Sequence, residues 1–180
     1  MKSMVEIGHS FLSPVLHRQA ICIDATFGQG KDTEYFVQRK IKKVYAFDIQ
    51  EHLIEKRKAD FEENVCLIVD SHANMAHYVN ESVDGIVFNF GYCPHGDVSI
   101  TTRPQESVCA IKEGLRLLRI KGRMALIVYP HQFGKEESSA IEMFLRSIDP
   151  HVVAIQKVSG LNIQTGPYAI LLEKRKEWNE

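Results

Sequence analysis

The segment from Ile21 to Thr33, ICIDATFGQGKDT, constrains the fold of this 180-residue chain more than any other feature. Its apolar start predicts a buried strand that ends at Asp24, and the residues after Gly30 predict a helix. Gly28 and Gly30 allow a tight turn between the two elements and let a ligand approach the backbone. In α/β proteins, this arrangement builds a nucleotide pocket at the carboxyl end of the first strand.

Acidic residues around this turn indicate the class of ligand. A second apolar run ends at Asp48, 20 residues beyond Gly28, where a ribose-binding carboxylate is expected. Thr33 stands where a dinucleotide fingerprint would have its third glycine, and the turn lacks the lysine-hydroxyl pair of a phosphate-binding loop. The charge of Asp24 and Asp32 favours S-adenosylmethionine, a cationic nucleoside without phosphates. A nicotinamide or nucleotide site and a turn without a ligand are the alternatives.

Short apolar runs alternate with amphipathic stretches, which predicts a mostly parallel sheet with helices on both faces. The expected strands are 20–24, 44–48, 65–69, 85–90, 123–129, 152–158 and 168–173. The expected helices are 5–16, 32–39, 51–61, 75–79, 104–118 and 135–148. Seven strands with a final hairpin around 163–167 match the Rossmann-like sheet of class I methyltransferases, whose last strand inserts antiparallel. We expect a single domain over 1–180, with a helical cap at 1–19 and a charged C-terminal tail at 174–180; the segment LEKRKEWNE at the end of the chain is expected to fray.

Composition excludes several other classes of protein. Hydrophobic residues make up 44% and charged residues 25%, as in globular proteins generally. No apolar run approaches the ~20 residues that span a bilayer, and the N-terminus lacks a signal-peptide pattern, so we expect a cytoplasmic protein. The net charge of −1 gives no overall attraction to nucleic acid. Basic clusters at 39–43, 56–58 and 116–123 are typical of solvated helix faces, with a local RNA patch as the alternative.

Cysteine and histidine spacing predicts no metal site. The four cysteines form no CxxC pair, and the eight histidines form no HxH or HExxH pattern. Cys22 and Cys66 lie in apolar runs and are expected to be small core residues.

The fourth strand ends in a sequence suited to an amine substrate. Asn89-Phe90-Gly91-Tyr92 is similar to the Asn-Pro-Pro-Tyr type motif of amino-methyltransferases. In that motif the Asn oxygen and a backbone carbonyl accept hydrogen bonds from the amine, and the aromatic ring packs on the base. Positioning the nitrogen lone pair in line with the methyl group supplies much of the rate. A strand end followed by an Asn turn is the alternative.

The aperiodic stretch from 91 to 104 follows this strand. An alkyl amine has a pKa of about 10 and must lose a proton before methylation. Asp97 or His95 can accept that proton, although Asp97 also suits a turn after Gly96. His72 and His131 follow other strands, and each is either a ligand contact or an ordinary loop histidine.

Five motifs in a fixed order carry a family resemblance. They are DATFGQGKDT at 24–33, AFDIQ at 46–50, Ser71-His72, FNFGYCPHGDVSITT at 88–102 and YPHQFGKEE at 129–137. Together they resemble the putative rRNA methylase family (YtqB-like), over roughly 8–173. Characterised members act as MnmM-type tRNA methyltransferases that convert wobble 5-aminomethyl-2-thiouridine to its 5-methylaminomethyl form. The resemblance therefore implies a Rossmann-fold, S-adenosylmethionine-dependent enzyme whose partner is the anticodon stem-loop of tRNA, and it leaves open a homodimer. A methyltransferase of the same fold that acts on rRNA or on a small-molecule amine, and a non-catalytic module that binds the cofactor or RNA, are the alternatives.

The resemblance also implies roles for individual residues. The donor site would comprise Asp24, Thr26, Gly28, Gln29, Gly30, Asp32, Thr33, Asp48, Ile49, Gln50, Ser71, His72 and Asn89. Asn89, Tyr92 and Asp97 would be catalytic, and His9, Pro94, Gly96, Thr101, Thr102 and His131 would contact the substrate. The chain departs from the family pattern at Gln29, Lys31, Cys93, His95, Val98 and Pro130. None of these departures removes the core acids or Asn89.

Overall fold

The computed structural model describes residues 1–90, 104–130, 135–163 and 165–178. Its centre is one seven-stranded sheet. The strands are β1 (Ile21–Asp24), β2 (Lys43–Asp48), β3 (Val65–Val69), β4 (Val83–Phe90), β5 (Leu118–Val128), β6 (Val153–Ser159) and β7 (Tyr168–Lys174). The α-helices are α1 (Met4–Leu12), α2 (Lys31–Gln38), α3 (Glu51–Arg57), α4 (Pro104–Leu117) and α5 (Lys135–Arg146). Three 3-10 helices complete the elements, η1 (Ser13–Val15), η2 (Lys58–Asp60) and η3 (His72–His77).

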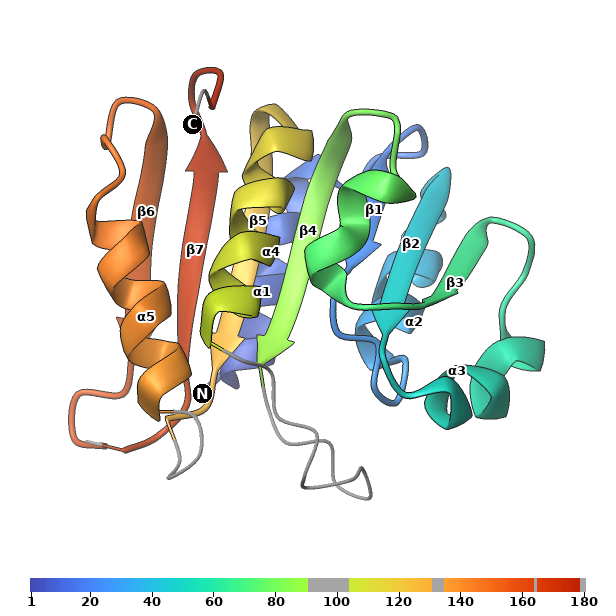
Figure 1. Ribbon diagram of the computed structural model, residues 1–180, viewed down its shortest axis with the longest axis horizontal. Coiled ribbons are helices and arrows are strands. Elements are labelled where there is room, and N and C mark those ends of the chain that lie inside the picture. Colours follow the sequence, from blue (N-terminus) through green and yellow to red (C-terminus); the bar gives the residue numbers. More distant parts are fainter. Residues whose placement is uncertain (91–103, 131–134, 164, 179–180) are drawn as a thin grey trace.

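The strands lie in the order β3-β2-β1-β4-β5-β7-β6, which Figure 1 shows from right to left. Strands β1 to β5 run parallel to one another, whereas β7 is antiparallel to both β5 and β6. The predicted sheet and its antiparallel last strand are therefore confirmed. Because β1, β2, β3, β4 and β5 are parallel, their carboxyl ends lie along one edge of the sheet, the lower edge in Figure 1.

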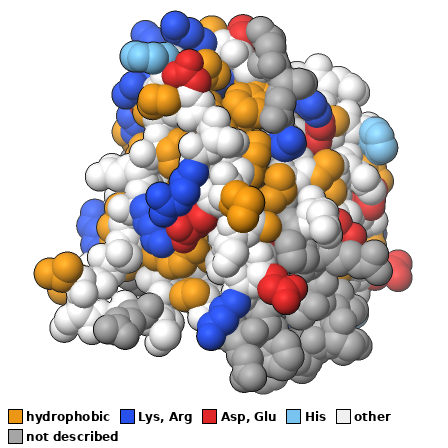
Figure 2. Space-filling view, turned by 60° about the vertical axis from the view of Figure 1, so that its left-hand side comes forward, with side chains coloured by type: hydrophobic (Ala, Val, Ile, Leu, Met, Phe, Trp, Pro, Cys, Tyr) orange, Lys and Arg blue, Asp and Glu red, His pale blue; other side chains and the backbone are white. Residues whose placement is uncertain are grey.

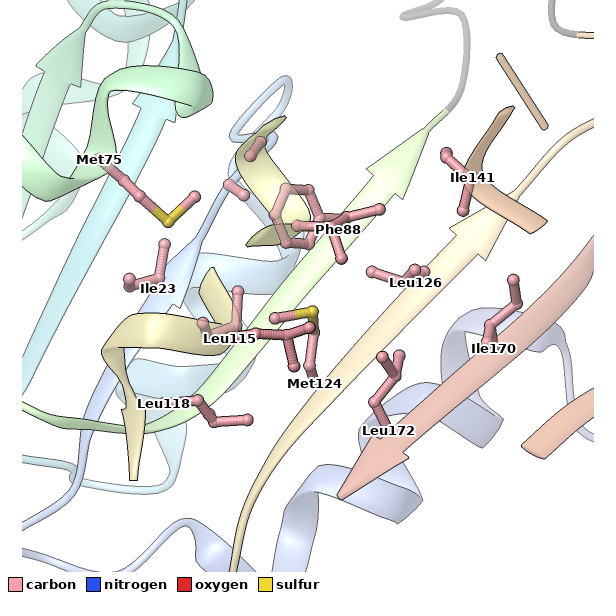
Figure 3. Packing of buried hydrophobic residues seen from close by; sticks show 14 of the residues in the cluster. Ile23, Met75, Phe88, Leu115, Leu118, Met124, Leu126, Ile141, Ile170 and Leu172 are labelled. Atoms are coloured by element: carbon pink, nitrogen blue, oxygen red, sulfur yellow. The ribbon is translucent and has the colours of Figure 1, made fainter. Parts of the chain in front are cut away.

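Helices cover both faces of the sheet. In Figure 1, α4 and α5 lie in front of it, and α1 and α2 lie behind it. Alternate residues of each strand point to opposite faces, so Ile23, Phe88 and Leu126 pack together on the front face (Figure 3). On the other face α1 lies close to β5 at Gly8, where a Cβ would come within 3.0 Å of Ile127 Cδ1. This close approach favours a glycine, because a side chain at this position would displace the tip of Ile127.

Three helix predictions need correction. The expected helix at 75–79 is instead η3, whose i→i+3 bonds include Tyr78 N–H to Met75 O at 3.1 Å, and the Ser71 hydroxyl caps its start. The expected helix at 5–16 ends at Leu12, because a 3-10 turn with a proline in its first positions follows. The expected helix at 51–61 ends as an α-helix at Arg57 and continues only as η2.

Up to Trp178, the C-terminal segment is packed against the fold and is not frayed as predicted. Lys174, the last residue of β7, is 1% exposed, and its Nζ donates a hydrogen bond to Leu118 O at 2.7 Å. The backbone N–H of Arg175 donates to Val152 O at 2.8 Å. The ring of Trp178 then packs edge-on against Phe144, at 6.1 Å between centroids. The prediction was wrong because it judged the segment by its charge, whereas its backbone pairs with the chain before β6.

Acidic and basic side chains lie side by side on the surface. Figure 2 shows acidic side chains beside basic ones on the face that carries α5 and β6. There Glu142 pairs with Lys157 at 2.6 Å and with Arg146 at 3.3 Å.

As predicted, Cys22 is buried and Cys66 packs against the core. No helix within the described ranges is long and apolar enough to cross a membrane.

Candidate active site

The carboxyl ends of β1, β2 and β4 bring polar side chains together at one edge of the sheet. Asp24 ends β1, Asp48 ends β2, and Asn89 is the penultimate residue of β4. The connection after β1 is bonded to both neighbouring strands, through Ala25 N–H to Val87 O at 2.9 Å and Phe27 N–H to Phe47 O at 2.8 Å. These bonds fix the glycine turn between the other two strand ends, as the sequence predicted.

The turn itself depends on its glycines. Gly28 has φ 50° and Gly30 has φ 76°, in the left-handed region that side chains disfavour. A Cβ at Gly30 would also lie 2.9 Å from the Phe27 ring, so this position excludes a side chain on two grounds. Gly30 directly precedes α2, which places Asp32 and Thr33 in the first turn of the helix at this edge.

Asp48 organises the turn from the neighbouring strand. One carboxylate oxygen accepts the Gly28 N–H at 2.8 Å, and the other accepts the Gln50 N–H at 2.9 Å. Each oxygen keeps a further lone pair, so the carboxylate can also accept hydroxyl groups. Ile49 beside it is 51% exposed and offers an apolar surface at the same edge. These contacts suit a carboxylate that binds a diol next to an apolar ring.

Asp24 is fully buried beneath the turn. It accepts the Thr33 hydroxyl at 2.7 Å and the Thr26 N–H at 3.1 Å. Burial, together with the nearby Asp32 carboxylate, raises the pKa of Asp24 to about 7. The two acids therefore form a negative cluster that a cationic ligand would stabilise, because its charge would favour the ionised form of Asp24.

Asp32 connects three elements. One of its oxygens lies 2.6 Å from His9 Nε2 of α1, and the other accepts Asn89 Nδ2 at 3.3 Å. The backbone N–H of Asn89 donates to the Thr26 hydroxyl at 2.7 Å, which ties β4 to the turn after β1. From the sequence, His9 was predicted to contact the substrate. Neither the contact of Asp32 with His9 nor that with Asn89 was predicted.

Tyr35 is a residue that the sequence reasoning missed. Its ring stacks on that of His9 with centroids 3.8 Å apart, and its hydroxyl donates to His9 O at 2.8 Å. Tyr129, which follows β5, is near the same cluster, since burial and the Asp32 carboxylate raise the pKa of Tyr129. Tyr35 stands in no motif, whereas Tyr129 begins the motif at 129–137 but was not predicted to be a site residue; the fold brings both to this edge.

His72 and Ser71 lie at the end of β3. His72 Nδ1 donates to Ala25 O at 3.0 Å, while the buried Nε2 has no hydrogen-bond partner within the described part of the chain. Desolvation lowers the pKa of His72, which keeps the ring neutral. The ring contacts Phe88 and Phe90, so it lies on the face of the sheet opposite to Asn89. The Ser71 hydroxyl accepts the Ala73 N–H at 3.2 Å and caps η3.

The structure thus brings much of the predicted donor site together. Asp24, Thr26, Gly28, Gly30, Asp32, Thr33, Asp48, Gln50 and Asn89 are linked by the contacts above. Seven predicted site residues lie outside the described residues: Tyr92, Pro94, Gly96, Asp97, Thr101, Thr102 and His131. Cys93, His95 and Val98 lie outside them as well. Within the residues that the structure describes, no group of three or more His, Cys, Asp or Glu could hold a metal ion.

Another buried acid, Asp84, lies at the opposite edge of the sheet near the start of β4. It accepts the Ile21 N–H at 2.9 Å and Arg119 Nε at 2.5 Å, and His17 Nε2 lies 3.3 Å away. Asp84 therefore anchors the amino ends of β1 and β4. Its role is structural, because the ligand edge of a parallel sheet is the carboxyl one.

Comparisons with known proteins identify the family of the chain. The family described as "Putative rRNA methylase" matches residues 44–174. The chain is 29% identical to a tRNA (mnm(5)s(2)U34)-methyltransferase of Arabidopsis thaliana chloroplasts, over 97% of this chain and 70% of that protein.

Solved structures share the fold over nearly the whole chain. A putative methyltransferase from Streptococcus mutans in complex with SAH (S-adenosylhomocysteine) is 38% identical, with a TM-score of 0.86 over 97% of this chain and 99% of that one. A putative rRNA-methylase from Clostridium thermocellum is 28% identical, with a TM-score of 0.89 over 97% and 98%. The fold is that of class I, Rossmann-like methyltransferases, and the chain belongs to the putative rRNA methylase family.

Proposed function

We propose that this protein is an S-adenosylmethionine-dependent methyltransferase that methylates the aminomethyl nitrogen of the wobble uridine in tRNA. The product would be 5-methylaminomethyl-2-thiouridine, formed from 5-aminomethyl-2-thiouridine on the anticodon stem-loop. The methyltransferase activity and its cofactor follow from the family and from the SAH-bound relative. The name of the Arabidopsis relative supports the nucleoside.

The residues at the carboxyl edge fit the cofactor. Asp48 has free lone pairs for the ribose hydroxyls, and the exposed side chain of Ile49 can pack against the adenine. Asp24 and Asp32 would balance the positive charge of the ammonium and sulfonium groups. Bound S-adenosylmethionine supplies an electrophilic methyl group on a positively charged sulfur.

Asn89 is the observation that carries the proposal for an amine. Its Nδ2 faces the carboxylate of Asp32, so Oδ1 points away from that carboxylate and, as far as the described residues go, is available to accept a hydrogen bond from a target N–H. Such a bond would orient the nitrogen with its lone pair toward the methyl group, and positioning of this kind supplies much of the rate. We further propose that Asp97 or His95 accepts the proton that the amine loses, and that Tyr92 packs against the base.

The description of the family favours a second candidate substrate, an amine of ribosomal RNA. A comparison of RNA classes would separate the two. Purified protein and methyl-labelled S-adenosylmethionine would be incubated with tRNA bearing 5-aminomethyl-2-thiouridine, with unmodified tRNA and with rRNA. We expect label only in the first. Label in rRNA alone would show that rRNA, and not tRNA, is the substrate. Absence of label from every RNA despite bound cofactor would refute the proposed function.

A further inference from the structure

The amide of Asn89 is held in one orientation. Its Nδ2 lies 3.3 Å from Asp32 Oδ2, and an ionised carboxylate only accepts hydrogen bonds. The amide nitrogen must therefore face Asp32, and the oxygen must face away from it. The backbone of Asn89 is fixed as well, through its N–H to the Thr26 hydroxyl at 2.7 Å. The direction of Oδ1 thus depends on the position and charge of one carboxylate.

That carboxylate is in turn held by His9. His9 Nε2 lies 2.6 Å from Asp32 Oδ1, and the two side chains are 17% and 7% exposed. A contact this short between an imidazole nitrogen and a carboxylate oxygen holds a proton, which Nε2 donates. Partial burial strengthens the bond, since little water competes for either partner. Asp32 therefore has one oxygen committed to His9 and the other to Asn89.

His9 has its own fixed place. Its ring stacks on Tyr35 with an interplanar angle of 7°, and Tyr35 donates its hydroxyl to the His9 carbonyl at 2.8 Å. The preceding residue, Gly8, lets α1 approach β5 closely enough for the ring to reach the strand ends. Contacts from α2 and β5 therefore position the imidazole.

We propose that His9 is a positioning residue for methyl transfer. Through Asp32 it fixes the amide of Asn89, so that Oδ1 is aimed at the target amine. The N-terminal helix α1 then contributes to the reaction without contacting the substrate. This inference rests on the proposed role of Asn89 toward an amine, and it replaces the substrate contact that the sequence predicted for His9.

Two substitutions at one position test this role. His9→Phe keeps a ring to stack on Tyr35 but removes the donor to Asp32, whereas His9→Gln restores a donor at the reach of Nε2. We expect His9→Phe to lower kcat about 10- to 100-fold, the loss expected when a reacting group is displaced by about 1 Å. We expect KM for tRNA and the Kd for S-adenosylmethionine to stay near their wild-type values, and His9→Gln to recover most of kcat.

His17→Phe is the matched control, because it breaks a second His–Asp contact, with Asp84, at the opposite edge of the sheet. It should turn over like wild type. Wild-type kcat in His9→Phe would overturn the inference, and so would an unrecovered kcat in His9→Gln. A raised KM with unchanged kcat would also overturn it, because His9 would then contact the substrate directly.

A readout without substrate separates this inference from the proposed function. The side-chain amide signals of Asn89, assigned through Asn89→Asp, would be followed by ¹⁵N NMR in the same variants. We expect the Nδ2 signals to shift in His9→Phe, to return in His9→Gln and to stay unchanged in His17→Phe. Unaltered Asn89 signals in His9→Phe would refute the inference even if the enzyme methylates tRNA. Inactivity of the wild type on tRNA would refute only the proposed function.

Discussion

Asp24→Asn should change how the stability of the protein depends on pH. Asp24 is fully buried, and its pKa is raised to about 7 by burial and by the Asp32 carboxylate. The asparagine side chain has nearly the same shape as that of aspartate, and its oxygen can still accept the Thr26 N–H. Its NH₂ group can donate to the Thr33 hydroxyl oxygen, so both hydrogen bonds are kept and mainly the charge is lost.

The sign of the effect follows from linkage. In the unfolded chain Asp24 loses its proton near its ordinary pKa of 3.8, whereas in the folded protein it keeps the proton to about pH 7. The folded state therefore carries no penalty from Asp24 at a pH below 3.8, and its stability falls as the pH rises from there to about 7. The full difference in pKa corresponds to about 4 kcal/mol, of which about 3 kcal/mol falls between pH 5 and pH 8.

Urea unfolding at constant ionic strength, followed by circular dichroism, measures this effect. The free energy of unfolding of the wild type should fall by about 3 kcal/mol between pH 5 and pH 8 relative to Asp24→Asn. Comparison with the variant removes the contribution of the other titrating groups. If the two proteins show parallel curves over this range, Asp24 does not change its protonation there, and the argument from its burial is wrong.

Three further predictions concern the same edge of the sheet. Asp48→Ala removes the charged acceptor for the ribose hydroxyls, which also holds two backbone N–H groups of the turn, so it should weaken S-adenosylmethionine binding by about 1.5–3 kcal/mol in calorimetry. Unchanged affinity would place the donor site elsewhere. Gly30→Ala must adopt φ 76° and place a Cβ 2.9 Å from Phe27, so it should lower the free energy of unfolding by at least about 1–2 kcal/mol, whereas Gly160→Ala should cost less; equal losses would refute the strain. The cofactor cation should release a proton from Asp24, so the heat of binding at pH 7 should depend on the ionisation enthalpy of the buffer; no such dependence in wild type would count against a cation beside this cluster.

Much of this fold could be predicted from local patterns. The run before Asp24 and the run before Asp48 each combine strand periodicity with a terminal acid, and their spacing matches one parallel crossover. The strand at 65–69 was predicted with its observed bounds for the same reason. Because parallel strands end at one edge, the side chains of Asp24, Asp48 and Asn89 could be expected together without coordinates.

Other features depend on contacts that no local pattern encodes. The partners of Asp32 come from α1 and β4, 23 and 57 residues away in sequence, and the stacked Tyr35 belongs to no motif. The buried Lys174 was predicted to belong to a charged tail, because its acceptor, the carbonyl of Leu118, lies 56 residues away in the sequence. β5 was predicted to begin at 123 but begins at Leu118, where a register shift against β4 accommodates Lys121 at φ 65°.

In the function that we propose, Asn89 directs a methyl group from S-adenosylmethionine to the side-chain nitrogen of the wobble uridine. The most direct measurement is a reaction with methyl-deuterated S-adenosylmethionine on tRNA bearing 5-aminomethyl-2-thiouridine, read by fragmentation of the isolated nucleoside in a mass spectrometer. We expect a trideuterated methyl group on the aminomethyl nitrogen with wild-type protein, and a strongly reduced yield with Asn89→Ala. A methyl group on any other atom, or an undiminished yield with Asn89→Ala, would contradict this proposal.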